Sequence, residues 1–211
     1  MGDWFRKASW SKADSEDFET RLSRARTTSR PQYLRIQAVH LFETGSKELI
    51  GVARVLAKRV TSEYLDDIQT GPAHHLLGQC HEALGAFPAA LDEFRLAVDW
   101  EVQVPTVRTD AYLDFAWLVA RQRLVEQFPE AVDLLTRFED RPVFPIQRYR
   151  YHGALAIIAD ERSDREVAHA AAHAALLAAR ETSSPFRFHP ALGLFKPTPD
   201  DMRKRLEALA T

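Results

Sequence analysis

The sequence predicts an all-α protein built as an α-solenoid, in which antiparallel helical hairpins stack one on the next. Apolar residues recur at intervals of three and four over most of the chain, which is the period of an amphipathic helix, and no segment alternates like a half-buried strand. The hexapeptide FPAALD at 87–92 also returns as FPEAVD at 128–133, after a shift of 41 residues. Such an internal echo indicates a repeated structural unit.

The first ten residues form a short aromatic and basic arm. Residues 1–10 carry Trp4, Phe5 and Trp10 beside basic side chains, and the stretch is too short to fold by itself. Amphipathic segments that bind membranes are usually longer and more basic, so we expect the arm to dock on the protein body. Residues 11–211 are expected to form a single all-helical domain.

Three helices are predicted directly after the arm. Ser11, followed by Asp14 three positions later, resembles a capping box and opens the first of them. The sequence TTSRP at 27–31 then breaks the helix. Residues 32–43 and 47–61 follow as a second and a third helix, with a Thr-Gly pair between them.

The clearest hairpin lies at residues 73–99. Leu77 and Leu84 belong to the apolar stripe of its first helix, and Gly85 lies where the chain turns. Phe94 belongs to the apolar stripe of its second helix. A hairpin of this size cannot bury both stripes alone, so it must stack against similar hairpins.

Further helices are predicted in the second half of the chain. They occupy residues 110–124, a segment that starts at 128, and residues 149–161 and 165–180. The last of these is rich in alanine, which lets a neighbouring helix approach closely. After a coil at 183–196, Thr198 and Pro199 resemble the N-cap and first-turn proline of a short final helix.

The hairpin at 73–99 resembles a tetratricopeptide repeat (TPR), a pattern of about 34 residues with Leu-Gly in its first helix and Ala-x-x-x-Phe in its second. Leu77 and Gly78 match the first motif, and Ala90 and Phe94 match the second. The resemblance implies that the single domain is TPR-like. It also implies a function, which is to bind a protein or peptide on the concave face that the first helix of each hairpin lines.

In that register the candidate partner-binding residues are His75, Gln79, Glu82, Arg123 and Asp160. The resemblance therefore predicts a scaffold or adaptor that recognises a protein partner, without catalysis. The sequence does not identify the partner, and it leaves the oligomeric state open.

Composition narrows the class of partner. The chain has 28 Lys and Arg against 30 Asp and Glu, a formal charge of −2 at pH 7, whereas a dedicated nucleic-acid binder carries a basic excess. Nucleic acid is therefore not the expected partner. No apolar run approaches the roughly 20 residues that span a bilayer, and the N-terminal residues lack the apolar core of a signal peptide. We expect a cytoplasmic protein with no membrane span.

The common catalytic motifs are absent from the sequence. It has no P-loop, no dinucleotide glycine fingerprint, no nucleophile elbow and no paired-cysteine metal spacing. Cys80, the only cysteine, lies on the apolar side of a helix and is predicted to be a buried thiol. We therefore expect a protein that is not an enzyme and that holds no cofactor and no metal.

Three alternative functions remain open. An immunity or antitoxin protein, which neutralises a partner enzyme, would also act by protein binding. His169 and His173 lie four apart on one helix and could share a metal ion in a metal-dependent enzyme, although no glutamate lies between them. A run of arginines from Arg21 to Arg35 could serve an RNA-binding helical array, although acidic residues precede it.

Overall fold

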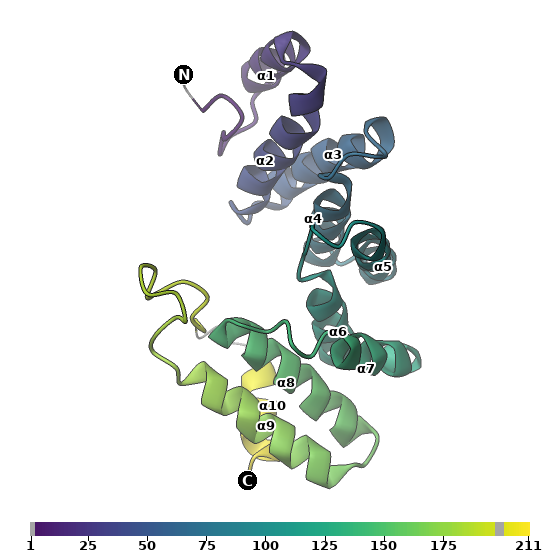
Figure 1. Cartoon of the computed structure of the whole chain (residues 1–211), viewed down its shortest axis with the longest axis vertical. Helices are drawn as coiled ribbons and strands as arrows, with labels where there is room; N and C mark the ends of the chain where they lie inside the picture. The colour runs from purple at the N-terminus through teal and green to yellow at the C-terminus, as the bar shows by residue number, and fades with distance from the viewer. Residues whose placement is uncertain (1–2, 197–200) are drawn as a thin grey trace. The chain divides into compact units, whose positions relative to one another are not determined.

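The computed structural model describes residues 3–196 and 201–211, and within these ranges the chain forms helices, turns and loops and no β-strand (Figure 1). This confirms the all-α prediction for the part of the chain that is described. The α-helices are α1 (Lys12–Arg24), α2 (Arg30–Phe42), α3 (Lys47–Glu63), α4 (Thr70–Ala83), α5 (Phe87–Gln103), α6 (Ala111–Gln122), α7 (Phe128–Arg137), α8 (Pro145–Glu161), α9 (Arg165–Ala179) and α10 (Asp201–Leu209). Among these residues no helix is both long and apolar enough to cross a membrane.

Local sequence determines where several of the helices begin. The Ser11 side chain caps α1 by accepting a hydrogen bond from the Asp14 backbone N–H, and the Asp14 side chain bonds back to the Ser11 backbone. Ser46 caps α3 in a similar way. Prolines lie in the first turns of α2, α5, α7 and α8, where no intrahelical donor is lost. For this reason Pro31 lies in a helix, where the sequence predicted a break, and α8 begins at Pro145, before the predicted start at residue 149.

Other helix ends differ by a few residues from the prediction. Helix α5 continues to Gln103, beyond the predicted hairpin of residues 73–99. Helix α10 is described from Asp201, whereas Thr198 and Pro199, the predicted cap and first-turn proline, lie outside the described residues.

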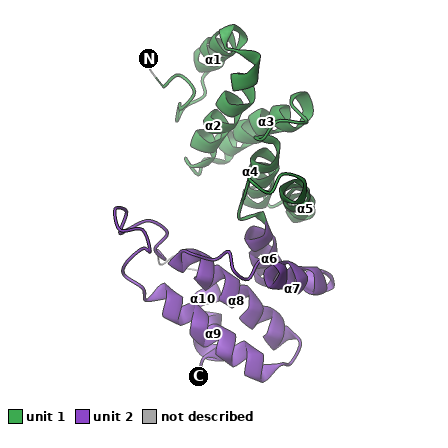
Figure 2. Ribbon diagram, viewed as in Figure 1, with its two compact units in different colours: residues 1–111 green, residues 112–211 purple. Residues whose placement is uncertain are grey.

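The chain clusters into two compact units, unit 1 at residues 1–111 and unit 2 at residues 112–211 (Figure 2). Unit 1 contains α1 to α5, and unit 2 contains α6, apart from its first residue, to α10. The prediction of one domain over residues 11–211 stays a prediction, because the clustering of contacts does not show whether the two units unfold together.

In unit 1 the helices pack in sequence order, α2 on α3, α3 on α4 and α4 on α5. A hydrophobic core runs from Phe18 of α1 to Cys80 of α4. Leu77 and Phe94 are buried, as predicted for the interior of the central hairpin. A Cβ atom on Gly78 would overlap the ring of Phe94, so the absence of a side chain lets α4 and α5 approach closely.

The N-terminal arm docks on unit 1, which confirms that prediction for residues 3–10. The Trp4 ring lies 5.3 Å from the ring of Phe18 and 5.0 Å from that of Tyr33. Gln37, fully buried in α2, holds the backbone of Lys7. The Lys7 N–H donates to Gln37 Oε1 at 3.0 Å, and Gln37 Nε2 donates to the Lys7 carbonyl at 2.8 Å.

In unit 2, α8 and α9 lie side by side, and α10 packs against both (Figure 1). Helix α10 makes this contact through Met202 and Leu206, which are its buried residues. Asp114 of α6 is almost fully buried and forms an ion pair with Arg150 of α8, with Oδ1 and Nη1 2.6 Å apart. The Arg150 guanidinium also lies over the ring of Trp117, so one side chain joins two helices by charge and by packing.

Candidate functional site

The three candidate residues of α4 lie on one side of that helix. His75, Gln79 and Glu82 are four and three positions apart, which places them within about 60° around the helix axis. All buried residues of α4 lie outside this sector, and α4 packs against both α3 and α5. The three side chains therefore occupy a sector of α4 that contains no fully buried residue.

These side chains are half-buried and already interact within the chain. The ring of His75 lies 5.9 Å from the ring of Phe94, and Gln79 and Glu82 also have partners in the protein. A binding partner would meet side chains that are ordered before it arrives, which reduces the entropy lost on binding. Their role in partner binding stays a prediction.

The other two candidate residues, Arg123 and Asp160, lie in unit 2 and belong to one cluster of ion pairs. Arg123 follows α6 in a left-handed conformation, with φ of 53°, and its Nε lies 3.3 Å from Glu161 Oε1. Arg205 of α10 binds Asp160 at 2.8 Å and Glu161 at 2.6 Å. The cluster neutralises its own charges and ties α10 to the end of α8. Whether either residue binds a partner also stays a prediction.

Unit 1 contains a groove that the sequence did not predict, and we call it the basic groove. It has a volume of about 440 Å³ between α3, α4 and α5. Its lining residues are Arg54, Val55, Lys58, Arg59, Ser62, Leu77, His81 and Glu93. Leu77 and His81 project from α4 at about 160° and about 120° around the helix from His75. The groove and the candidate face are therefore separate surfaces of the same helix.

Two charged residues of the basic groove have close partners within unit 1. Arg59 binds Glu19 at 2.6 Å and Glu63 at 3.1 Å. Glu93 of α5 lies 2.6 Å from His74 Nδ1 of α4, and both side chains are largely buried. These pairs join α3 to α1 and α5 to α4, so they are structural contacts.

Arg54 and Lys58, one turn apart on α3, have no such partners. The side chain of neither residue forms an ion pair or a hydrogen bond with a residue in the described ranges, although the Lys58 backbone carbonyl accepts from Thr61 and Ser62. Burial lowers the pKa of His81, and the charges of Arg54 and Lys58 lower it further against an opposing effect of Glu93. The sequence does show the four-residue spacing of the two cations. It does not show that α4 and α5 close a groove beside them.

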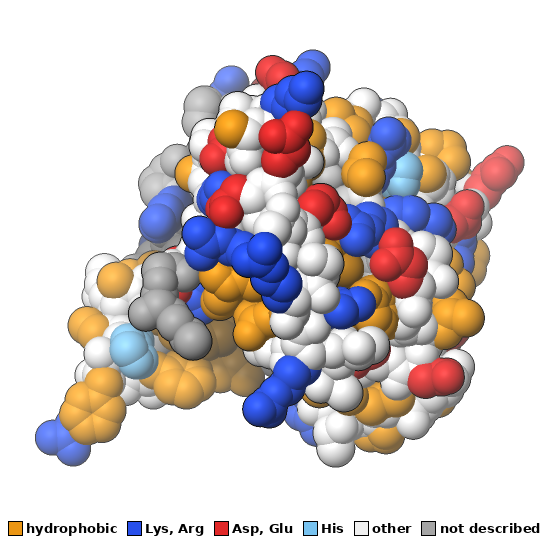
Figure 3. Space-filling model, turned by 90° about the horizontal axis from the view of Figure 1, so that it is seen from above, with side chains coloured by type: hydrophobic (Ala, Val, Ile, Leu, Met, Phe, Trp, Pro, Cys, Tyr) orange, Lys and Arg blue, Asp and Glu red, His pale blue; other side chains and the backbone are white. Residues whose placement is uncertain are grey.

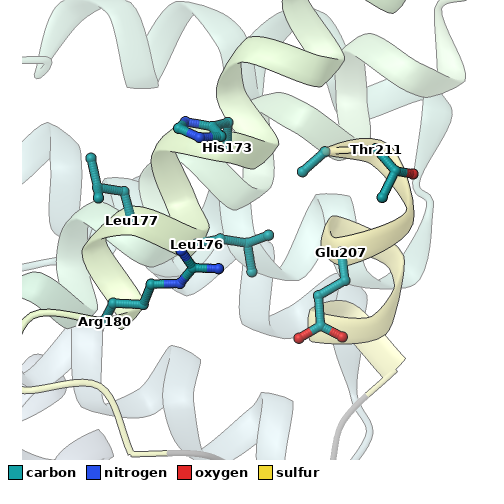
Figure 4. Close-up of a pocket in the computed structure, with 7 residues that line it drawn as sticks. His173, Leu176, Leu177, Arg180, Glu207 and Thr211 are labelled. Carbon is teal, nitrogen blue, oxygen red and sulfur yellow. The ribbon is translucent and has the colours of Figure 1, made fainter.

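A second cleft, with a volume of about 380 Å³, lies in unit 2 between α9 and α10. Figure 4 shows side chains of both helices around it. Its lining residues are His173, Leu176, Leu177, Arg180, Glu207, Ala210 and Thr211. His169 is not among them.

In the part of the chain that the structure describes, no three His, Cys, Asp or Glu side chains gather so that they could hold a metal ion. The expectation of no metal stays a prediction.

Cys80 is buried in α4, as predicted. Burial raises the pKa of its thiol to about 12, because a thiolate is poorly solvated there, and the charge of Arg54 opposes the rise only in part. At neutral pH this cysteine is therefore a protonated core thiol and not a nucleophile.

Comparisons with family models, with curated proteins and with solved structures found no match to this chain. The functional interpretation therefore depends on the residues and their geometry.

Proposed function

We propose that this chain is a TPR-like α-solenoid that acts as a non-catalytic interaction module and binds a protein or peptide on its concave face. The observation that carries the proposal is the setting of α4. This helix packs against α3 on one side and α5 on another, and it keeps a sector without buried residues. A stacked hairpin array leaves such a sector on its inner helices, and here it carries His75, Gln79 and Glu82.

Surface charge supports a protein partner over a nucleic acid. Figure 3 shows acidic and basic side chains interspersed on the face that it displays, with hydrophobic side chains between them. With a formal charge of −2, the chain lacks the basic excess that phosphate binding calls for.

A reducing cytoplasm suits the single buried thiol of Cys80, so we place the module there.

Arg123 and Asp160 have a smaller part in this proposal than the residues of α4. Their charges are already paired with Glu161 and Arg205, and a partner would have to replace those contacts. We therefore assign recognition first to the α4 face. An immunity protein that neutralises an enzyme would act through the same kind of surface, and it would be recognised by tight one-to-one binding.

The test is a triple variant of the α4 face, His75→Ala with Gln79→Ala and Glu82→Ala. A matched control, Glu16→Ala with Thr20→Ala and Ser23→Ala, has the same spacing on the exposed side of α1. Tagged versions of both are used to recover proteins from the native cell, and the recovered partner is purified and titrated by calorimetry.

We expect the α4 variant to lose at least about tenfold in affinity, since the anchors of an interface cost 1 kcal/mol or more on removal. The control should bind as the parent does. Equal affinity of both variants would exclude the α4 face as the binding surface.

A further inference from the structure

We propose that the basic groove of unit 1 is a second binding surface and that it takes an acidic segment of a partner protein in extended conformation. Two carboxylates of the segment pair with Arg54 and Lys58, and an apolar side chain between them contacts Val55. This inference does not depend on the proposed function of the α4 face, because the groove is lined from a different side of that helix.

The dimensions of the groove fit an extended segment. From Arg54 to Ser62, α3 rises about 12 Å, which about four residues of extended chain can follow. Arg54 and Lys58 are separated by a rise of about 6 Å. Side chains at alternate positions of an extended chain are about 6.6 Å apart, so two carboxylates on one edge can reach both cations. The residue between them then faces the opposite edge, toward α4.

The chemistry of the groove selects an acidic and apolar ligand. The side chains of Arg54 and Lys58 form no ion pair in the described chain, although Glu93 lines the same groove, and they stand beside Val55, whose exposed fraction is 56%. Carboxylates would supply the missing charges, and an apolar side chain would remove Val55 from water. The lining contains no Phe, Tyr or Trp ring on which a nucleotide base could stack. A peptide therefore fits the groove better than a single-stranded nucleic acid.

The first experiment measures binding of a fluorescein-labelled peptide of about eight residues in which glutamate and leucine alternate. Its comparison peptide has glutamine in place of glutamate. The test variant is Arg54→Glu with Lys58→Glu, both exposed positions on α3. The matched control is Arg24→Glu with Arg26→Glu, which changes the net charge equally at exposed positions outside the groove.

We expect fluorescence anisotropy to show that the groove variant binds the acidic peptide at least about tenfold more weakly, while the control stays within about twofold of the parent. Binding should weaken as salt is added, and the glutamine peptide should bind far less. Equal binding by the parent and the groove variant would overturn the proposal. So would a uridine oligonucleotide that binds more tightly than the peptide and loses affinity in the same variant.

The second experiment detects ligand in the groove by measuring the pKa of His81, which lines it. Carboxylates placed beside Arg54 and Lys58 would offset the two charges that help to lower the pKa of His81. Saturation with the acidic peptide should therefore raise that pKa, as followed by NMR titration of the imidazole signal. No shift on saturation would mean that the peptide binds elsewhere. The α4 triple variant should keep full affinity for the peptide, so the two surfaces can fail independently.

Discussion

The hairpin α4–α5 of unit 1 and the hairpin α8–α9 of unit 2 both pair two helices, but different side chains fill the contact between the two helices. In α4–α5 one large ring, Phe94, fills the space that Gly78 leaves open. In α8–α9 the contact surface of α9 is made of small side chains, and every buried residue of that helix is alanine. One hairpin thus sets large rings against glycines, Phe94 at Gly78 and Trp100 at Gly71, with Phe94 the fully buried one, and the other distributes its packing along the helix.

The difference indicates which substitutions should most reduce the stability of each hairpin. A single large knob carries much of the buried surface, so its removal leaves one large cavity. A row of methyl groups shares the burial, so removal of any one leaves little space. We expect substitutions of similar kind to have unequal effects in the two hairpins, and the following predictions test this from the largest expected effect to the smallest.

Removal of the knob should have the largest effect. Phe94 is fully buried, and Phe94→Ala should lower the free energy of unfolding by about 3 to 5 kcal/mol. Ala172 is equally buried in α9, but Ala172→Gly removes one methyl group and should cost about 1 to 2 kcal/mol from helix propensity and lost burial. Urea unfolding at unchanged m-value measures both. Similar losses would show that packing is not concentrated at Phe94.

Filling the space opposite the knob should come next. A Cβ at Gly78 overlaps the buried Phe94 ring, so Gly78→Ala should cost about 1 to 3 kcal/mol. Gly153→Ala in α8 should cost less, because its Cβ would meet the outer edge of the Trp117 ring at 2.9 Å. Gly51→Ala in α3 is the control, since nothing lies within 4 Å of its Cβ. It should stabilise by about 0.5 to 1 kcal/mol, and a melting series can rank all three variants.

The sequence predicted the two hairpins because their pattern is local. Apolar residues at helical spacing, Gly85 in the turn and the alanines of residues 165–180 all act within a few positions, and the helices appear where that pattern placed them. Gly78 and Phe94 were each recognised in the sequence as part of a repeat motif, and the structure shows that they contact each other. The helix starts at Arg30, next to Pro31, and at Pro145 were missed, since a proline that ends one segment is equally suited to begin the next.

The candidate site was less predictable, because a surface is made by elements that are distant in sequence. The helical register correctly set His75, Gln79 and Glu82 on one side of α4. It did not reveal that Arg205, 45 residues after Asp160, forms an ion pair with that carboxylate. The basic groove was missed for the same reason, since Arg54 and Glu93 meet only through the packing of α3, α4 and α5.

The third prediction compares the ion pair of each hairpin. His74 and Glu93 lie 2.6 Å apart with 15% and 13% of their side chains exposed, whereas Arg148 and Glu181 lie equally close with 37% and 35% exposed. Glu93→Ala leaves a largely buried imidazole without its partner and should cost about 1 to 2 kcal/mol. Glu181→Ala should cost at most about 0.5 kcal/mol, because water solvates the remaining guanidinium. Equal losses in chemical denaturation would remove this distinction between the hairpins.

The N-terminal arm provides a third case, because charges as well as packing hold it. Lys7 Nζ lies 3.1 Å from a carboxylate oxygen of both Asp14 and Asp17. Hydrogen bonds from the Ser11 backbone and side chain, and then from Lys7, lower the pKa of Asp14, and bonds from Arg21 and Lys7 lower that of Asp17. Burial alone would lower the pKa of Lys7, but its bonds to the two aspartates raise it above 10.5.

The arm should therefore loosen in acid before either hairpin does, and this is the smallest effect that we predict. A carboxylate with a lowered pKa stabilises the fold fully above its unfolded value of 3.8, and this stabilisation is lost as the pH falls through the lower folded value. Hydrogen exchange of the arm, corrected for intrinsic rates, should accelerate below about pH 4 while α4 and α9 stay protected. Lys7→Met should weaken the arm at neutral pH and reduce its acid response. If α4 and the arm lose protection together in the parent, the arm is not a separately held region.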